Sequence, residues 1–553
     1  MPESRNTYLF IHPGDNMGVA LEDLLAGTPI KAKDKEVILR ENIPAKHKFS
    51  LKALSTGDPV FLYGVLVGKA VKPIEPGSLI TIHNIEHASA EFSLGKRDLD
   101  WEKPDISKFE NKTFMGFPRE DGSVGTANYW LVIPLVFCEN RNIQVLKEAL
   151  LNPLGYRKAN SYEKEVEEML ALYVKGNSLE AIENGKLEGT GKRSSSKRVF
   201  KNLDGIKFLN HSMGCGETRQ DSISLCGLLA GYITHPNVAG ATILSLGCQH
   251  AQIPLLEKEI QKRDSHFNKP LVVLEQQKLG TEKNLLQTAI KKTLAGLVEA
   301  NKIQRQAFPL SKLCIGLECG GSDGFSGISA NPALGYVSDL MVALGGSVIL
   351  SEFPELCGVE QELSNRCVDE NTANRFMDLM VNYHKRAEKD GSGFYANPSP
   401  GNIRDGLITD AIKSAGAAKK GGTSPVMGVW DYPEKIKGPG LHLLCTPGSD
   451  VESTTAEVGS GANLVLFTTG LGTPTGNPIA PVVKLSTNSR LYAHMPDIID
   501  INCGGIIESR ESIRELGERI LNDIIEVASG NKETKAMELD QDDFIPWKRG
   551  VSL

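Results

Sequence analysis

The chain has 553 residues, of which 40% are hydrophobic and 23% charged, so it is too long for a single core and too apolar to be disordered. Its net charge is −7 without a long basic block, and its longest apolar run, near residues 130–137, is too short for a membrane span. We therefore expect neither a nucleic-acid nor a membrane partner. The start is mostly polar and the ten cysteines stand singly, which predicts a cytoplasmic protein with reduced thiols.

Residues 1–95 predict a small, mostly β module. Short β-rich pieces at 37–39, 60–62 and 79–82 are separated by glycine and proline, as is typical of strands joined by tight turns. The polar residues 96–112 that follow are interpreted as a linker.

Two α/β domains with parallel sheets are predicted next, over residues 113–300 and 301–553. From residue 205 onward, apolar runs of strand length alternate with helical segments, for example 285–300 and a closing helix near 512–528. Residues 140–200 break this pattern with charged helical segments and a stretch rich in Gly, Ser and Lys, and we interpret them as an insertion. The predicted strands of this part are 206–209, 241–246, 271–274, 313–317, 347–350, 441–445, 463–467 and 481–485.

Several predicted strands end in loops that carry cysteine beside glycine and acidic residues: Cys215, Cys248, Cys319 and Cys357. Ligands of open α/β sheets bind at the carboxyl ends of strands, so these loops are candidate sites. Cysteine is often only a small buried hydrophobic residue, which suits Cys226 and Cys314 in their apolar runs. A set of thiolates favours iron, alone or in a cluster, over magnesium, although the spacing matches no standard zinc or ferredoxin motif.

Histidines form a second group of candidates. Three of them lie in polar or turn contexts of the N-terminal module, and a fourth follows a predicted strand: His12, His47, His83 and His211. A lone histidine is usually structural, whereas several in so small a module, with Asp15 and Asn16 beside the first, predict a binding cluster.

Glycine-rich loops at 320–324, 459–461 and 470–478 are a third signal. Backbone amides of such loops can hold an anion, although ordinary tight turns explain any one of them equally well. None has the context of a nucleotide-binding loop, so a carboxylate is the expected anion.

Short motifs follow one another along almost the whole chain: 11–16, 47–48, 63–64 and 83–84, then 116–126, 211–216, 235–240 and 246–248, then 318–323, 329–333, 352–355 and 470–478. In this order they resemble the altronate/galactarate dehydratase family, whose enzymes begin with a β-clip-like SAF domain. The resemblance implies dehydration of D-altronate to 2-dehydro-3-deoxy-D-gluconate, or the matching reaction of galactarate. Leu62, Thr81 and Ala127 stand where Lys, His and Arg are common in the family, so the acid accepted is less determined than the reaction.

Dehydration of a 2,3-dihydroxy acid needs a base for the C2 proton, an acid for the departing C3 hydroxyl and a cation that stabilises the enediolate. The resemblance implies Fe²⁺ as the metal, with Mn²⁺ or an iron–sulfur cluster as alternatives. The catalytic candidates are His12, His47, His83, His211 and Glu318. The candidates for binding substrate are Asp15, Asn16, Lys48, Asn84, Arg119, Ser322 and Asp323. The metal candidates are Cys215, Cys248, Cys319, Glu352 and Cys357.

Two other functions stay open on the sequence alone. One is a carbon–sulfur lyase acting on a sulfonated hydroxy acid, and the other is a sugar-acid binding protein without catalysis. A small-molecule sugar acid is the expected partner, and we expect a homo-oligomer. We also expect the N-terminal module to close over the strand ends and to form part of the site.

Overall fold

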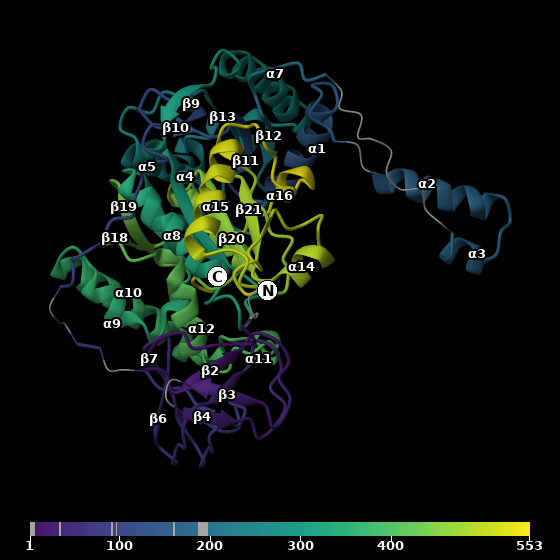
Figure 1. The fold of residues 1–553 in the computed structure, drawn as a ribbon. Coiled ribbons are helices and arrows are strands. Elements are labelled where there is room, and N and C mark those ends of the chain that lie inside the picture. The colour runs from purple at the N-terminus through teal and green to yellow at the C-terminus, as the bar shows by residue number, and fades with distance from the viewer. Residues whose placement is uncertain are drawn as a thin grey trace.

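The computed structural model describes residues 6–553 except 33–34, 90–91, 94, 96, 159–160 and 186–196. The N-terminal β module lies at one end of the molecule, the third domain in the middle and the second domain at the other end (Figure 1). Among the described helices, none is long and apolar enough to cross a membrane.

The N-terminal module consists of short antiparallel strands, in agreement with its predicted class. The strands are β1 (Tyr8–Leu9), β2 (Met17–Ala20) and β5 (Lys48–Ser50) in one sheet, β3 (Pro29–Ala32) and β4 (Lys35–Ile38) in a second, and β6 (Pro59–Leu62), β7 (Val65–Ala70) and β8 (Ile85–Glu86) in a third. Residues 79–82, predicted as a strand, instead make one bridge from Leu79 to Phe49 and then a turn. The side chain of Asn84 takes the place of a strand partner there, because it bonds Thr81 N at 2.7 Å and Leu79 O at 2.7 Å.

The second domain contains a parallel sheet of order β12-β11-β13-β14. Its elements are β11 (Tyr129–Pro134), η1 (Phe137–Glu139), α1 (Asn140–Leu151), β12 (Gly205–Phe208), α4 (Arg219–Thr234), β13 (Val238–Ser245), α5 (Ile253–Arg263), β14 (Leu271–Glu275), α6 (Gln276–Leu279) and α7 (Glu282–Ala300). A small antiparallel sheet of β10 (Val124–Gly125), β9 (Thr113–Pro118) and β15 (Gln306–Pro309) lies beside it. Fully buried Trp130 fills one side of the core, and a Cβ at Gly296 would lie 2.0 Å from its ring, so α7 approaches the sheet closely.

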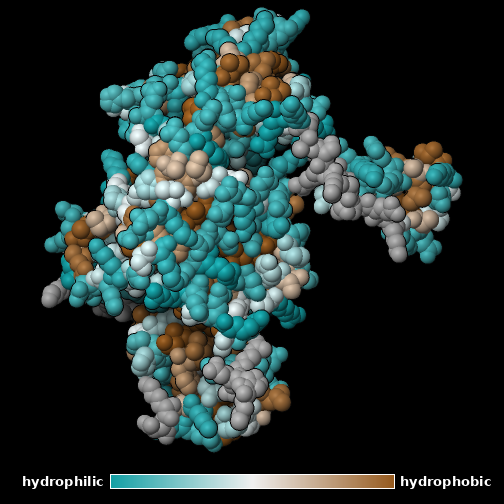
Figure 2. Space-filling model, turned by 45° about the horizontal axis from the view of Figure 1, so that its top comes forward, coloured by the Kyte–Doolittle hydropathy of each residue, from teal (hydrophilic) through white to brown (hydrophobic). Residues whose placement is uncertain are grey.

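The predicted insertion at 140–200 contributes to the core and to a projection. Helix α1 packs its apolar face into the core, whereas α2 (Ser161–Val174) and α3 (Leu179–Glu183) form a hairpin that stands away from the body (Figure 1). Val166, Leu170 and Tyr173 of α2 are exposed, and brown apolar side chains gather on this hairpin in the space-filling view (Figure 2).

The third domain contains a seven-stranded parallel sheet of order β18-β19-β17-β16-β20-β21-β22. Its strands are β16 (Cys314–Cys319), β17 (Ser347–Leu350), β18 (Val426–Trp430), β19 (Gly440–Leu444), β20 (Leu464–Thr469), β21 (Val482–Ser486) and β22 (Ile501–Asn502). Its helices are η2 (Leu310–Lys312), α8 (Ala330–Ala343), η3 (Phe353–Leu356), α9 (Glu360–Asn365), α10 (Glu370–Lys389), η4 (Phe394–Ala396), α11 (Pro400–Arg404), α12 (Asp410–Ala417), η5 (Ala418–Gly421), α13 (Asp450–Ser460), α14 (Ser489–His494), α15 (Ile513–Ala528) and α16 (Lys535–Glu538).

The eight runs predicted as strands after residue 205 all lie on strands of these two parallel sheets. The closing helix predicted near 512–528 is α15, which begins after a capping box of Ser512 and Glu515. Helices α4 and α13 touch between the sheets, since a Cβ at Gly231 would lie 2.1 Å from Gly459 O. All seven strands of the larger sheet run in one direction, so their carboxyl ends share one edge of the domain.

Candidate active site

The central strands β16 and β17 deliver chemical groups to one point at this edge. Leu317 pairs with Leu350, so the residues that follow, Glu318 and Cys319 on β16 and Glu352 after β17, lie side by side. Glu352 has a left-handed backbone conformation, with φ of 61°, that is costly for a residue with a side chain. Such strain at a strand end is typical of functional sites.

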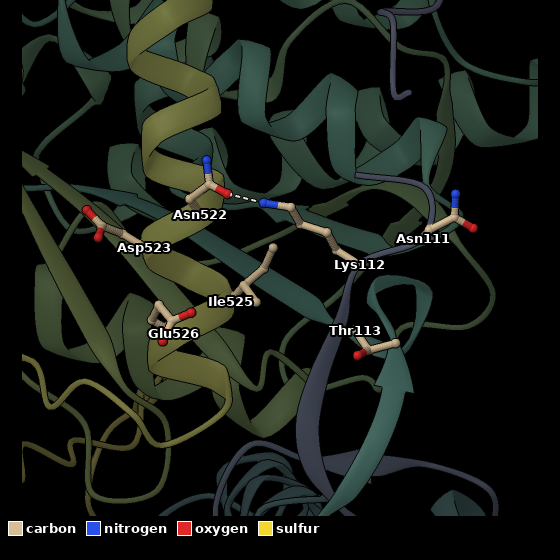
Figure 3. Close-up of a pocket in the computed structure, with 7 residues that line it drawn as sticks. All are labelled: Asn111, Lys112, Thr113, Asn522, Asp523, Ile525 and Glu526. Atoms are coloured by element: carbon tan, nitrogen blue, oxygen red, sulfur yellow. Dashed lines mark hydrogen bonds between the residues drawn. The ribbon is translucent and has the colours of Figure 1, made fainter. Parts of the chain in front are cut away.

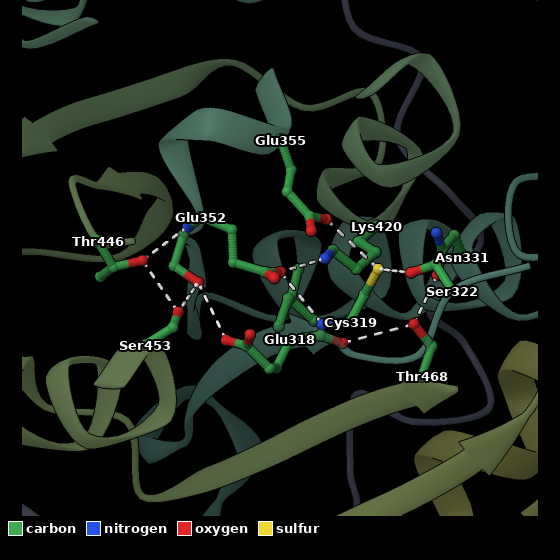
Figure 4. Close-up of polar contacts among 12 residues, drawn as sticks. Glu318, Cys319, Ser322, Asn331, Glu352, Glu355, Lys420, Thr446, Ser453 and Thr468 are labelled. Atoms are coloured by element: carbon green, nitrogen blue, oxygen red, sulfur yellow. Dashed lines mark hydrogen bonds and ion pairs between the residues drawn. The ribbon is translucent and has the colours of Figure 1, made fainter. Parts of the chain in front are cut away.

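Two buried ion pairs surround the thiol of Cys319, and Figure 4 shows the pair of Lys420 and Glu352. Lys420 Nζ lies 2.6 Å from Glu352 Oε2, and Lys413 Nζ lies 2.6 Å from Glu355 Oε1. The Cys319 sulfur lies 2.8 Å from the Ser322 hydroxyl and 3.6 Å from Glu355 Oε2. The chain thus places two ammonium groups, two carboxylates and a thiol in one buried cluster.

Two further buried carboxyl groups lie behind this cluster. Glu457 Oε1 accepts hydrogen bonds from Ser351 Oγ at 2.7 Å and from Leu317 N at 3.1 Å. Ser351 also contacts Glu318 Oε2 at 3.5 Å. Both Glu318 and Glu457 are fully buried, although glutamate is one of the residues least often buried in proteins.

The buried acids therefore have unequal proton affinities. Burial, followed by the charges of Glu352 and Glu457, raises the pKa of Glu318 well above its ordinary value. Burial is also the main cause that raises the pKa of Glu352 to about 7 and that of Glu457 to about 8. Burial also acts to raise the pKa of Glu355, but the charges of Lys413 and Lys420 outweigh it and lower that pKa. Such a set offers both a proton donor and a proton acceptor near neutral pH.

This cluster also fits a cation. Ligand atoms of Cys319, Glu352 and Glu355 all lie within 4.8 Å of one another. Glu318 Oε1 and Glu352 Oε1 are buried, and neither has a hydrogen-bond partner within the described part of the chain. A thiolate with carboxylate oxygens is a donor set that suits Fe²⁺ or Mn²⁺.

The N-terminal module contacts this region through the loop of Lys46, among other contacts. Lys46 Nζ lies 3.1 Å from Asp323 and 2.7 Å from Asp405, both in the third domain. The contact is tight, because a Cβ at Gly324 would lie 2.3 Å from Lys46 O. Lys48 is fully buried and donates to Gly406 O at 2.6 Å, and burial lowers its pKa to about 7. Asp323, which contacts the module, thus follows Cys319 of the thiol cluster by only four residues in the chain.

Four of the residues singled out in the sequence meet in the thiol cluster (Figure 4): Glu318, Cys319, Ser322 and Glu352. Lys48 and Asp323 lie at the adjoining contact with the module. His47 lies in the same loop as Lys46, and its ring bonds Ala45 O at 3.1 Å. Burial lowers the pKa of His47, which therefore favours the neutral form that a base requires.

Other candidates of the module hold its turns. Asp15 accepts hydrogen bonds from the backbone N–H of His12, Tyr63 and Gly64, and Gly14 N donates to His12 Nδ1 at 3.1 Å. Asn16 bonds Pro59 O and Phe61 N, and Asn84 holds the turn described above. His83 is exposed, with its backbone N bonded to Thr81 Oγ1.

The metal candidates do not form a single set. Cys215 and Cys248 follow strands of the second domain's sheet, whereas Cys319 ends a strand of the third domain's sheet. Cys357 is part of a different group at the module interface, where its sulfur lies within 4.8 Å of ligand atoms of His87 and Asp410. The loops of these cysteines have similar sequences after predicted strands, but their strands do not all belong to the same sheet.

His211 and Arg119 also lie in the second domain, where they bond neighbouring loops. His211 Nε2 donates to Pro134 O at 2.7 Å and Nδ1 accepts from Met213 N at 3.2 Å, while burial lowers its pKa to about 4. Arg119 donates to Pro236 O at 2.6 Å and to Asn128 Oδ1 at 2.9 Å. These hydrogen bonds hold loops of the second domain in place and occupy both ring nitrogens of His211.

Residues that the sequence did not single out complete the cluster: Lys46, Asp405, Lys413, Lys420 and Glu457. Lys413 lies on α12 and Lys420 on the 3-10 turn η5 that follows it directly. Lys46 directly precedes the candidates His47 and Lys48, so it is the basic residue nearest to them in the sequence.

A surface hollow of about 470 Å³ lies elsewhere, between β9 and α15 (Figure 3). Lys112 lines it and bonds Asn522 at 2.5 Å, next to Asp523 and Glu526. The hollow has neither the thiol nor the buried acids of the cluster, so it is not the candidate site.

Fold and site together define a three-part α/β enzyme with buried acid–base groups at parallel strand ends. Three family descriptions match in order: "Altronate/galactarate dehydratase SAF domain" at residues 6–88, "D-galactarate dehydratase/Altronate hydrolase, second domain" at 116–301, and "D-galactarate/Altronate dehydratase, C-terminal" at 310–552. The chain belongs to the altronate/galactarate dehydratase family, which is a family of hydro-lyases.

Known relatives cover the whole chain. The altronate dehydratase of Bacillus subtilis (strain 168) is 32% identical over 99% of this chain and 100% of its own length. The altronate dehydratase of Escherichia coli (strain K12) is 31% identical with the same coverage. The galactarate dehydratase (L-threo-forming) of the same organism is 30% identical over 95% of this chain and 94% of its own length.

Proposed function

We propose that the chain removes water from D-altronate to give 2-dehydro-3-deoxy-D-gluconate. The observation that carries this proposal is the buried cluster of Glu352, Glu355, Cys319, Lys413 and Lys420 at the ends of β16 and β17. Two relatives that match the chain from end to end are altronate dehydratases. Galactarate is the alternative substrate, since the galactarate dehydratase is almost as similar.

The residues of the chain supply the acid and the base. With a pKa of about 7, Glu352 can take up the C2 proton and release it again near neutral pH. Burial and the neighbouring acids raise the pKa of Glu318 well above its ordinary value, which favours the protonated form that can donate toward the departing hydroxyl. Lys413 and Lys420 stay charged in spite of burial, because Glu355, Cys319 and Glu352 raise their pKa, and they offset the negative charge of the enediolate.

A divalent cation, Fe²⁺ in preference to Mn²⁺, belongs to this proposal. Cys319, Glu352 and Glu355 would hold it, since their ligand atoms converge and Glu352 Oε1 has no partner among the described residues. Such a cation would act as a Lewis acid on the substrate carboxylate.

The N-terminal module would close the site on its open side. Lys46 is about one-fifth exposed and lies between Asp323 and Asp405, so its ammonium group can meet a carboxylate that enters there. The loop that carries Lys46 would also exclude water from the strand ends, which would strengthen the charge interactions beneath it.

The test is an anaerobic assay of purified protein with Fe²⁺ and a thiol reductant, in which formation of a 2-keto-3-deoxy acid is measured for D-altronate and galactarate. We expect turnover of D-altronate and its loss after chelation. Lys46→Met should raise KM by at least tenfold, whereas Lys52→Met, which changes an exposed lysine of the same module, should leave KM unchanged. Absence of a 2-keto acid from both substrates, or release of sulfite from sulfolactate instead, would contradict the proposal.

A further inference from the structure

Three cysteines of the second domain are exposed: Cys138, Cys215 and Cys248. Cysteine is among the residues most often buried, and the other seven cysteines of this chain are buried or half-buried. The three exposed thiols therefore require an explanation other than packing.

The sheet brings these three thiols together. They follow β11, β12 and β13, which are neighbours in the parallel sheet, so all three lie beyond the same edge. Backbone hydrogen bonds join the three loops, because Phe137 N donates to Met213 O at 3.0 Å and Ala251 N donates to Gly214 O at 3.1 Å. His250 N also donates to Cys215 O at 3.3 Å, which ties the loop of Cys248 to that of Cys215.

Backbone features hold the middle loop in place. Gly214 has φ of 104°, and a Cβ there would lie 2.4 Å from Leu135 O, so the loop of Cys215 lies directly against the end of β11. The carboxylate of Glu217 accepts from Gly214 N at 3.0 Å and from Ser222 Oγ at 3.0 Å. The thiols thus lie on a rigid support rather than on free loops.

Electrostatics agrees with this proximity. Partial burial and, next, the charge of Cys215 raise the pKa of Cys138, and Cys248 adds to the effect. Three neighbouring thiols can bind one shared positive centre as thiolates, so their grouping favours a metal centre over three free thiols.

We propose that Cys138, Cys215 and Cys248 bind a cubane [4Fe–4S] cluster through three of its irons. The three sulfurs do not all lie within 4.8 Å of one another, whereas a single tetrahedral ion with bonds of about 2.3 Å would draw them closer. Separate irons of one cluster accommodate the wider spacing, and thiolates are the usual ligands of such clusters. The fourth iron would have no thiolate from the described residues, and it would bind water or an oxygen of a small ligand.

This centre is distinct from the cluster around Cys319, so its test is independent of the dehydratase proposal. The whole chain is purified anaerobically and reconstituted with ferrous iron and sulfide, and iron, acid-labile sulfide and absorbance near 400 nm are measured. We expect about four irons and four sulfides per chain. Cys138→Ser, Cys215→Ser and Cys248→Ser should each lower the sulfide content at least fivefold, and Cys319→Ser should leave it unchanged.

Each variant changes an exposed residue, so the thermal unfolding midpoint of its apo form should equal that of the parent chain, which verifies folding. Iron without acid-labile sulfide, sulfide that persists in all three variants, or a disulfide between two of these cysteines in the anaerobic protein would overturn the proposal. Loss of turnover in Cys319→Ser with full sulfide content would leave the cluster in place and bear only on the dehydratase site.

Discussion

The buried ion pair of Lys420 and Glu352 offers the sharpest test of how the candidate site is held together. Both side chains are 1% exposed, and the nitrogen and oxygen lie 2.6 Å apart. Lys420→Met keeps most of the volume and removes the charge, which leaves Glu352 buried without its cation. Removal of one partner from a buried pair costs about 3–5 kcal/mol. For a domain of this size that corresponds to a lowering of the unfolding midpoint by roughly 10 °C.

The loss should depend on pH. Burial already raises the pKa of Glu352 to about 7, and removal of Lys420 raises it further. A carboxyl group with a raised pKa in the folded state destabilises that state as pH rises above its ordinary pKa of 4.5, because the unfolded chain releases the proton first. The difference between parent and variant should therefore be smallest near pH 5 and should grow toward pH 9.

The measurement is thermal unfolding of chelator-treated protein at several pH values, with Lys108→Met as the matched control. Lys108 also lies 2.6 Å from a carboxylate, that of Glu518, but it is 63% exposed. An exposed pair contributes less than about 1 kcal/mol, so this control should barely move the midpoint. The double variant Lys420→Met with Glu352→Gln should recover much of the stability. Equal shifts in Lys420→Met and Lys108→Met, or a loss independent of pH, would refute the reasoning.

Two further predictions concern the module contact and the deepest acid. Gly324→Ala would place a Cβ 2.3 Å from Lys46 O, so the module must shift and turnover should fall at least tenfold, while Gly401→Ala, whose Cβ meets nothing closer than 3.7 Å, should keep full activity. Equal turnover of the two variants would show that the module contact does not matter for catalysis. Glu457→Gln keeps an oxygen for the hydrogen bonds from Ser351 and the backbone but cannot ionise. Because burial raises the pKa of Glu457 to about 8, the parent chain loses stability as pH rises through that value, and the variant should unfold at a higher temperature than the parent at pH 9 in calorimetry. A lower midpoint for the variant at pH 9 would contradict this assignment.

The sequence by itself determined the local architecture. Apolar runs such as 347–350 and 441–445 are strands, because a buried parallel strand needs uninterrupted hydrophobic residues whatever its neighbours are. The same logic located the loops after these strands, and hence Cys215, Cys248, Cys319 and Glu352. A local exception is the stretch 79–82, where the side chain of Asn84 competes for the backbone groups that a strand would use.

Only the tertiary structure decided which loops meet. Cys215 and Cys319 have similar glycine-flanked contexts, yet strand order assigns them to different sheets and to different clusters. Lys420 looks like a surface lysine in sequence, and only packing beneath β17 buries it against Glu352. Cys138 ends an apolar run and carries no local signal, and it joins Cys215 and Cys248 because β11 lies between β12 and β13. Burial and strand order depend on contacts between residues far apart in the chain, and local pattern does not encode them.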